Sequence, residues 1–423
     1  IVYLERDGYR VARLLARDVP ALGYRTYSVR NRPPGEPVKA TESSDRWELE
    51  GPYYRLRLDP ATGAIASLYD KEAGRELADG AAPLQLNQLL YVSGGENSRI
   101  LHDLSTLPLP KLEVAGPRAA RLIENVRTPY GRRMKLRAEA PHISRLETEI
   151  TLYDEIKRVD ITNRLEKEEV RAKEAVYFAF PFGVSPAELA YQVQNGFVWA
   201  EKDQLPGAGR EWFTTQNLIL ARDSGITIAW ATPDAPLVTL TDINRGRWPR
   251  RLELRNGHVF SYVMNNYWFT NYRASQGGEF VFRYFISSGR ELGAEALARF
   301  DSETRSPLVV YPYYDSANID FSRREARLPM AQGSFFKVSG DNVQLAAFKP
   351  AEDGNGWIVR LRETAGRAGT ARLEGFAFPM SGAYLANGVE ANIQPLATNA
   401  GSVEAPLKAY QYTTVRLMSG SRP

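Results

Sequence analysis

Residues 259–286 read VFSYVMNNYWFTNYRASQGGEFVFRYFI. Aromatic and β-branched residues fill both ends of this stretch, and from Phe280 to Phe285 they follow an alternating pattern. A period of two residues is typical of a half-buried β-strand, so the stretch predicts two strands joined by a polar block. That block contains Asn265, Asn266, Tyr267, Trp268 and Asn271.

The polar block has two interpretations. Asparagines can be buried only with many hydrogen-bond partners, so the block is either a heavily bonded corner between strands or a polar surface lined by rings. Aromatic rings cover the apolar face of a pyranose, and amides bond its hydroxyls. The second interpretation therefore predicts a sugar-binding surface made of Asn265, Asn266, Tyr267, Trp268 and Asn271, and both interpretations remain open.

Composition limits the class of protein. A chain of 423 residues with 43% hydrophobic residues can form two or three domains. The net charge is +4 without a long basic run, which excludes a nucleic acid as the expected partner. No apolar run reaches about 18 residues, so no membrane-spanning helix is expected. We expect a bacterial, soluble protein of the cytoplasm or periplasm, and the strand-like opening Ile1–Tyr3 suggests a fragment or a processed chain.

Strand and turn signals dominate the chain. Residues 54–58 alternate in polarity, and DPATG at 59–63 predicts a hairpin turn because Gly63 allows a positive φ. The run AVYFAFPF at 175–182 predicts a central strand, and the one expected helix spans 290–300. Many short strands with little helix predict an all-β fold built of antiparallel sandwiches.

Motifs for known chemistries are few. The three histidines, His102, His142 and His258, lack metal-ligand spacing, so no metal site is expected in this chain. Phosphate-binding loops and a G-x-S-x-G nucleophile are absent from the sequence. Glu201, Asp203 and Arg210 lie in a loop-like stretch between strands and could reach a polar ligand, whereas the alternative is a solvated surface loop. A pair of glycosidase carboxylates cannot be selected among 50 acidic residues.

Several stretches resemble glycoside hydrolase family 38, the α-mannosidases, in the same order along the chain. They are WELEGPYYRLRLDPATGAIASLYDKEAGREL at 47–77, LPGAGREWFTTQ at 205–216, GITIAWATPDAPLVTLTD at 225–242, MNNYWFTNYRASQGGEFVFRY at 264–284 and VQLAAFKPAEDGNGWIVRL at 343–361. The resemblance implies the end of a small β-sandwich at 1–40, a galactose-mutarotase-like β-supersandwich at 41–305 and a C-terminal β-sandwich at 306–423.

Members of this family have a catalytic domain that precedes the β region and carries zinc ligands and an aspartate nucleophile. None of the motifs of that domain matches the present sequence. The resemblance therefore implies the C-terminal β region of an α-mannosidase-like hydrolase, without cofactor or catalytic residues of its own. Its expected partners are the zinc-binding catalytic domain and a mannoside-like carbohydrate. Two alternatives stay open: a stand-alone carbohydrate-binding protein that uses the polar block, and a mutarotase- or lyase-like enzyme that pairs His142 or His258 with a carboxylate.

Overall fold

The computed structural model describes most of the chain. The described residues are 2–6, 9–27, 45–95, 111–246, 248–267, 274–310, 329, 331–399 and 401–420.

The chain forms two compact units, each made of two segments. The first unit contains residues 1–14 and 38–292, and the second contains residues 15–37 and 293–423. The boundary at 292/293 lies before the predicted one at 305/306, and residues 1–40 divide between the units. The division into three domains stays a prediction.

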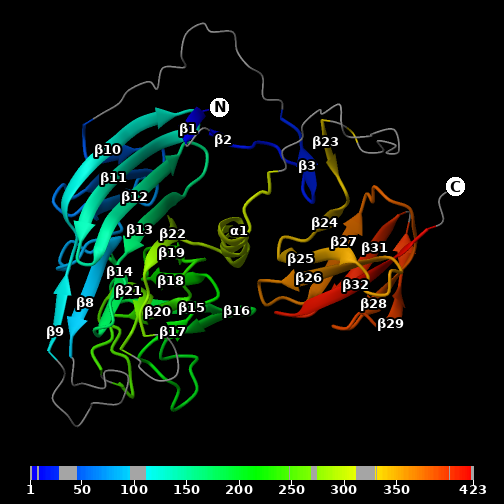
Figure 1. Cartoon of the computed structure of the whole chain (residues 1–423). Helices are drawn as coiled ribbons and strands as arrows, with labels where there is room; N and C mark the ends of the chain where they lie inside the picture. The colour runs from blue at the N-terminus through cyan, green and yellow to red at the C-terminus, as the bar shows by residue number, and fades with distance from the viewer. Residues whose placement is uncertain are drawn as a thin grey trace, which may run out of the picture. The chain divides into compact units, whose positions relative to one another are not determined.

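The first unit contains two large antiparallel sheets (Figure 1). In the described residues, the larger sheet has nine strands in the order β10 (Arg118–Thr128), β11 (Gly131–Ala140), β12 (Ile143–Tyr153), β13 (Val159–Lys167), β22 (Gly278–Gly289), β19 (Thr227–Ala231), β18 (Leu218–Arg222), β15 (Glu188–Val193) and β16 (Gly196–Trp199). The smaller sheet, counted over the same residues, has six strands in the order β17 (Phe213–Thr214), β20 (Leu237–Leu240), β21 (Gly257–Asn265), β14 (Glu174–Phe182), β8 (Gln88–Gly94) and β9 (Leu112–Ala115).

Two smaller pieces complete the described part of this unit. A four-stranded sheet has the order β4 (Glu48–Glu50), β5 (Tyr54–Leu58), β6 (Ile65–Asp70) and β7 (Arg75–Glu76), and a hairpin joins β1 (Val2–Arg6) to β2 (Tyr9–Arg13).

One large core lies inside the first unit because its strands alternate in polarity. On β5 every second side chain is buried, and these side chains join apolar residues of both large sheets. Strand β14 is buried along its whole length, since Phe178 and Phe180 pack in this core while Tyr177 and Ala179 pack in a second cluster on the other face. The predicted central strand is therefore confirmed.

The predicted hairpin at residues 59–63 is also confirmed. Strands β5 and β6 are antiparallel neighbours, and the N–H of Gly63 donates to the carbonyl of Asp59 at 2.7 Å. Gly63 has φ of +75°, and a Cβ there would lie 2.6 Å from Cδ1 of Leu136. The left-handed backbone conformation favours glycine, and a Cβ would also displace the end of the Leu136 side chain.

The second unit contains two antiparallel sheets around its own core. Over the described residues, the four-stranded sheet has the order β24 (Lys337–Ser339), β27 (Gly369–Glu374), β31 (Ser402–Leu407) and β30 (Thr398–Asn399). The five-stranded sheet, counted over the same residues, has the order β25 (Val343–Pro350), β26 (Trp357–Glu363), β32 (Tyr412–Ser419), β28 (Met380–Ala386) and β29 (Asn392–Leu396). Phe336 is fully buried between them and contacts the rings of Phe348 and Phe376. A separate pair joins β3 (Gly23–Arg25) to β23 (Gln332–Ser334).

The one helix of the described residues, α1 (Ala294–Arg305), belongs to the second unit. It starts later than the predicted residue 290 because Gly293 is extended and β22 continues to Gly289. It continues beyond Phe300 to Arg305, and in this last part Arg305 pairs with the buried Asp301 at 2.7 Å.

The all-β fold predicted from the sequence is confirmed, with a large two-sheet sandwich accompanied by smaller β elements. In the part of the chain that the structure describes, no helix combines the length and the apolar character needed to cross a membrane.

Candidate functional site

A partly buried polar cluster lies where β13 ends and β14 begins; we call Tyr91, His142, Lys167, Glu168 and Glu174 the Lys167 cluster. Nζ of Lys167 lies 2.8 Å from Oε1 of Glu174, and the two side chains are only 0% and 5% exposed. Lys167 also donates to the backbone carbonyl of Glu168 at 2.7 Å. Because an unpaired buried charge is very costly, each partner holds the other in place.

Tyr91 on β8 completes the buried part of this cluster. Its hydroxyl donates to Oε2 of Glu174 at 2.5 Å, and Lys167 lies 5.8 Å from the centre of its ring. Burial raises the pKa of the Tyr91 hydroxyl, and the hydrogen bond to the Glu174 carboxylate raises it further. Tyr91 therefore stays protonated and acts as a fixed donor.

His142 and Glu168 form the exposed edge of the cluster. Nδ1 of His142 lies 3.0 Å from Oε2 of Glu168, and the side chains are 47% and 59% exposed. The His142 ring also contacts the ring of Tyr91, with 5.3 Å between the centres. A histidine beside a carboxylate can exchange protons, so this edge is the part of the cluster capable of acid–base chemistry.

Asn265, Asn266 and Tyr267 lie beside this cluster, at the end of β21. The N–H of Glu174 donates to Oδ1 of Asn266, and Nδ2 of Asn266 donates to the carbonyls of Val170 at 3.1 Å and Ala172 at 2.7 Å. Asn266 is 7% exposed. Its amide is thus fully used inside the protein, as the first interpretation of the polar block requires.

The neighbours of Asn266 are also held internally. Oδ1 of Asn265 accepts from the N–H of Tyr267 at 2.9 Å, and the Tyr267 hydroxyl donates to the carbonyl of Gly94 at 3.2 Å. The Tyr267 ring is buried in the second apolar cluster of the first unit. Trp268 and Asn271 lie outside the described residues, so the sugar-binding role predicted for the whole block stays a prediction.

The structure brings Glu201 and Arg210 together. Arg210 donates from Nε to Glu201, whose same carboxylate accepts from the N–H of Leu252 at 2.9 Å. These two side chains are mostly buried, whereas the exposed Asp203 closes a turn by accepting from the N–H of Trp199 at 2.9 Å. The loop is therefore fixed from within, and a ligand contact by these three residues remains predicted.

His258 is the second histidine beside a carboxylate. Its Nε2 lies 2.8 Å from Oδ2 of Asp79, and the side chains are 12% and 27% exposed. Burial alone raises the pKa of the Asp79 carboxyl, but hydrogen bonds from His258 and the backbone N–H of Ala81 outweigh it and lower that pKa. The ionised carboxylate orients the imidazole, which is a feature of acid–base pairs. His102 lies outside the described residues.

No group of three His, Cys, Asp or Glu side chains in the described ranges is arranged to hold a metal ion. The family resemblance places the zinc in a preceding catalytic domain, and these described residues supply no set of ligands for it.

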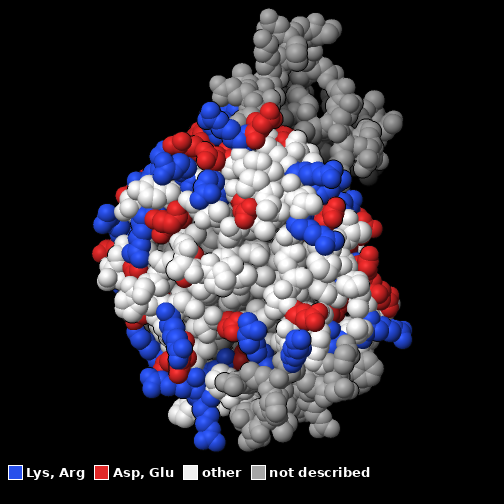
Figure 2. Space-filling model, turned by 90° about the vertical axis from the view of Figure 1, so that its left-hand side faces the viewer, with Lys and Arg blue, Asp and Glu red and all other residues white. Residues whose placement is uncertain are grey.

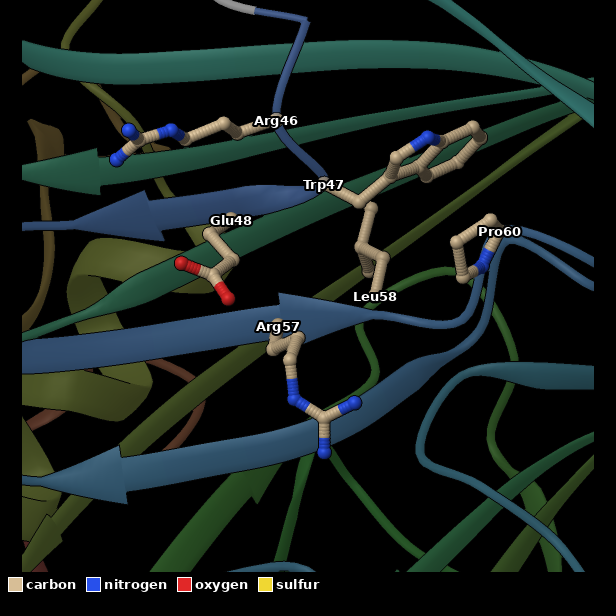
Figure 3. Close-up of a pocket in the computed structure, with 6 residues that line it drawn as sticks. All are labelled: Arg46, Trp47, Glu48, Arg57, Leu58 and Pro60. Atoms are coloured by element: carbon tan, nitrogen blue, oxygen red, sulfur yellow. The ribbon is translucent and has the colours of Figure 1, made fainter.

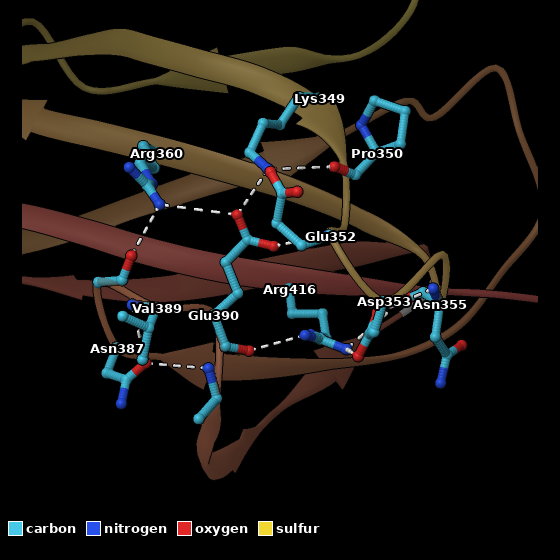
Figure 4. Close-up of polar contacts among 12 residues, drawn as sticks. Lys349, Pro350, Glu352, Asp353, Asn355, Arg360, Asn387, Val389, Glu390 and Arg416 are labelled. Carbon is cyan, nitrogen blue, oxygen red and sulfur yellow. Dashed lines mark hydrogen bonds and ion pairs between the residues drawn. The ribbon is translucent and has the colours of Figure 1, made fainter.

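A second polar network lies on the five-stranded sheet of the second unit (Figure 4). The Glu390 carboxylate, 4% exposed, lies 2.7 Å from Nζ of Lys349 and 3.6 Å from Arg360. Arg416 on the neighbouring strand pairs with Asp353 at 2.6 Å and donates to the carbonyl of Glu390 at 2.7 Å. These contacts hold the turn before β29 against β25, β26 and β32, and they indicate a structural role.

Glu363 ends β26 in the same unit and is fully buried. Its carboxylate accepts from the N–H groups of Ala365, Gly366 and Tyr410, each at 2.8 Å, and from Asn342 at 2.8 Å. Burial raises the pKa of Glu363, but the hydrogen bonds from Tyr410, Ala365 and Asn342 outweigh it and lower the pKa to about 2.

Surface charge is mixed on the face of the molecule in Figure 2. Lys and Arg side chains are interspersed there with Asp and Glu around an uncharged central area, and no basic stripe crosses the described residues of this face. A continuous basic stripe is the usual electrostatic footprint of nucleic-acid binding.

Sequence reasoning missed the buried members of the Lys167 cluster, Tyr91, Lys167 and Glu174. One signal was present: Lys173 and Glu174 directly precede the apolar run of β14, and Lys167 ends the alternating strand β13. A charge at the edge of a buried strand needs a partner, but the sequence does not show that the partner of Glu174 is Lys167 rather than Lys173.

Two family models match the sequence. The model described as the glycosyl hydrolases family 38 C-terminal domain matches residues 49–219, and the one described as the family 38 C-terminal beta sandwich domain matches residues 342–415. Together the two matches cover more than half of the chain. No curated protein sequence matches it.

Two solved structures share the fold over most of this chain. A protein in glycosyl hydrolase family 38 from Enterococcus faecalis is 13% identical, with a TM-score of 0.62, over 89% of this chain and 44% of that chain. An alpha-mannosidase from Enterococcus faecalis V583 is 12% identical, with a TM-score of 0.62, over 88% of this chain and 42% of that chain. A galactose mutarotase-like protein from Lactobacillus casei has a TM-score of 0.36 at 10% identity, over 57% of this chain and 99% of that chain. The chain thus spans less than half the length of the two Enterococcus proteins.

Proposed function

Since the chain belongs to glycosyl hydrolase family 38 through its two C-terminal domains, we propose that it serves as the C-terminal β region of an α-mannosidase-like hydrolase. The observation that carries the proposal is the succession of both family domains, at 49–219 and then 342–415, along one β chain. In this proposal the nucleophile, the zinc and most of the sugar pocket belong to a catalytic domain that the β region supports.

The internal chemistry of the first unit supports this role. Lys167, Glu174 and Tyr91 use their charged and polar atoms on one another, and Asn266 uses its amide on backbone groups. Groups that are saturated in this way add rigidity rather than reactivity. A rigid β region can hold a neighbouring domain and its loops in a fixed geometry, which catalysis requires.

Within this proposal, one wall of the pocket comes from the β region. The candidates are Glu201, Asp203 and Arg210 in one loop, and Asn265, Asn266, Tyr267, Trp268 and Asn271 in the polar block. Glu201 and Arg210 already fix each other, so their contribution would be to hold the loop backbone rather than to bind sugar directly.

The experiment compares the purified chain, a family catalytic domain alone, and the two produced together. The assay follows hydrolysis of an aryl α-mannoside with zinc present. We expect no turnover by this chain and higher, more heat-stable activity for the pair than for the catalytic domain alone. Robust turnover by the purified chain would overturn the proposal, and so would a pair that behaves as the catalytic domain does by itself.

We propose a second candidate function, acid–base conversion of a free sugar, because His258 lies 2.8 Å from the ionised Asp79. An imidazole oriented by a carboxylate can move a proton at a sugar hydroxyl or ring oxygen. Polarimetry of freshly dissolved α-D-glucose and α-D-galactose tests this activity. An acceleration that His258→Asn removes would support it, and a rate equal to the buffer rate would exclude it.

A further inference from the structure

An open hollow of about 390 Å³ lies beside the start of β4 in the first unit (Figure 3). Its lining residues are Arg46, Trp47, Glu48, Arg57, Leu58 and Pro60. The volume falls in the usual range of about 300–1,000 Å³ for small-molecule pockets. None of these residues belongs to the Lys167 cluster, to the loop of Glu201 and Arg210 or to the polar block.

The lining divides into an apolar side and a charged side. Figure 3 shows the half-buried indole of Trp47 and the ring of Pro60 on one side, and the carboxylate of Glu48 and the guanidinium of Arg57 on the other. Leu58 is only 1% exposed and belongs to the core beside them. Glu48 and Arg57 are paired residues of β4 and β5. Among the described residues, neither of these two side chains has a hydrogen-bond or ion-pair partner, so both are available to a ligand.

The backbone that carries these groups is held firmly. Nδ2 of the buried Asn125 donates to the carbonyl of Arg46 at 2.8 Å and to the carbonyl of Glu48 at 3.1 Å. The N–H of Leu58 donates to the carbonyl of Trp47 at 2.8 Å. A site fixed before binding loses less conformational entropy when a ligand enters.

We propose that this hollow binds a pyranoside ring, separately from the catalytic pocket. The indole covers the apolar face of the ring, the Glu48 carboxylate accepts from its hydroxyls, and the Arg57 guanidinium donates to them. A bare anion would meet the negative charge of Glu48, and an apolar ligand would leave both charged groups without partners. The choice of a mannoside as the first sugar rests on the proposed function, whereas the sugar class rests on the lining residues.

Saturation-transfer NMR on the full chain tests the proposal, with methyl α-mannoside as the probe and methyl α-glucoside and methyl β-galactoside beside it. The variants are Trp47→Ala and Glu48→Gln, and Trp248→Ala is the control because Trp248 is an exposed indole outside the lining. Glu48→Gln keeps the size of an exposed side chain, so it tests binding even if Trp47→Ala weakens the fold. Melting temperatures of all variants are measured in parallel.

We expect binding with a Kd of about 1 mM, weakened about five- to tenfold by Trp47→Ala and about threefold by Glu48→Gln, and unchanged by Trp248→Ala. No saturation transfer from any of the three sugars would overturn the proposal. Equal affinity of the wild type and both lining variants would also overturn it. Binding of glucoside or galactoside in preference to mannoside would support a pyranoside site, and the aryl mannoside assay would report separately on the proposed function.

Discussion

Deletion of the Asn266 amide decides between the two interpretations of the polar block. Asn266→Ala removes one acceptor, used by the N–H of Glu174, and two donors, used by the carbonyls of Val170 and Ala172. Each lost hydrogen bond costs about 0.5–1.5 kcal/mol, and a buried partner left without a bond costs more. We therefore expect the free energy of unfolding to fall by about 2–4 kcal/mol, a large share of the about 5–15 kcal/mol that stabilises a typical protein.

Urea unfolding of the purified chain, followed by circular dichroism and tryptophan fluorescence, measures this loss. The midpoint of the first unit should fall by about 1 M while the slope stays constant, because the change removes bonds without altering the surface exposed on unfolding. Asn265→Ala is the matched control. It removes one acceptor, used by the N–H of Tyr267, and should cost about 1 kcal/mol.

An Asn266→Ala midpoint equal to that of Asn265→Ala would refute the structural interpretation. If the same change also altered the KM or kcat of an intact enzyme for a mannoside without altering its stability, Asn266 would be a sugar ligand. A stability loss with unchanged kinetics would establish that the asparagine is a structural corner.

Three further changes test other parts of the structure. Lys167→Met should lower the free energy of unfolding by about 3–5 kcal/mol because it leaves the buried Glu174 carboxylate without its cation, and adding Glu174→Gln should restore part of that loss in the same urea assay. Gly63→Val should lower the free energy of unfolding by more than about 1 kcal/mol, and with it the melting temperature, since φ is +75° and the new Cβ meets Leu136. An unchanged melting temperature would contradict the turn geometry. Because the pKa of Glu363 is lowered in the folded state, its carboxylate stabilises the second unit fully above about pH 4.5, and this contribution is lost as the pH falls toward about 2. The acid unfolding of the second unit should therefore be less steep in Glu363→Gln. Identical acid unfolding curves for the wild type and this variant would count against this account.

Local features of the fold could be predicted from the sequence because they depend on residues close together in the chain. The turn at Gly63, the alternation along β5 and the apolar run of β14 each follow from neighbouring residues. The predicted helix begins four residues too early because apolar spacing does not show that Gly293 is extended. The pairing of β13 with β22 and of β14 with β21 joins residues far apart, and alternation alone does not specify which strands pair.

The contacts of the candidate site were harder to predict from the sequence, because most of them join residues that lie far apart in the chain. The sequence shows that Asn266 needs hydrogen-bond partners, but those partners lie 92 to 96 residues earlier in the chain. Glu201 and Arg210 are nine residues apart, and their pairing was within reach of local reasoning. Lys167 and Tyr91 meet only because strands far apart in the sequence come together in space.

The pairing of β3 with β23 has a consequence for how the protein is made. The hydroxyl of Ser334 donates to the carbonyl of Ala21 across 313 residues, so β3 leaves the ribosome long before its partner strand exists. At about 5–20 residues per second, a ribosome needs about 15–60 s to supply that partner. During this time β3 is an unpaired strand edge exposed to other nascent chains. A chaperone that shields the segment around β3 should therefore raise the folding yield, and any shortened gene that ends before β23 should produce an aggregating protein.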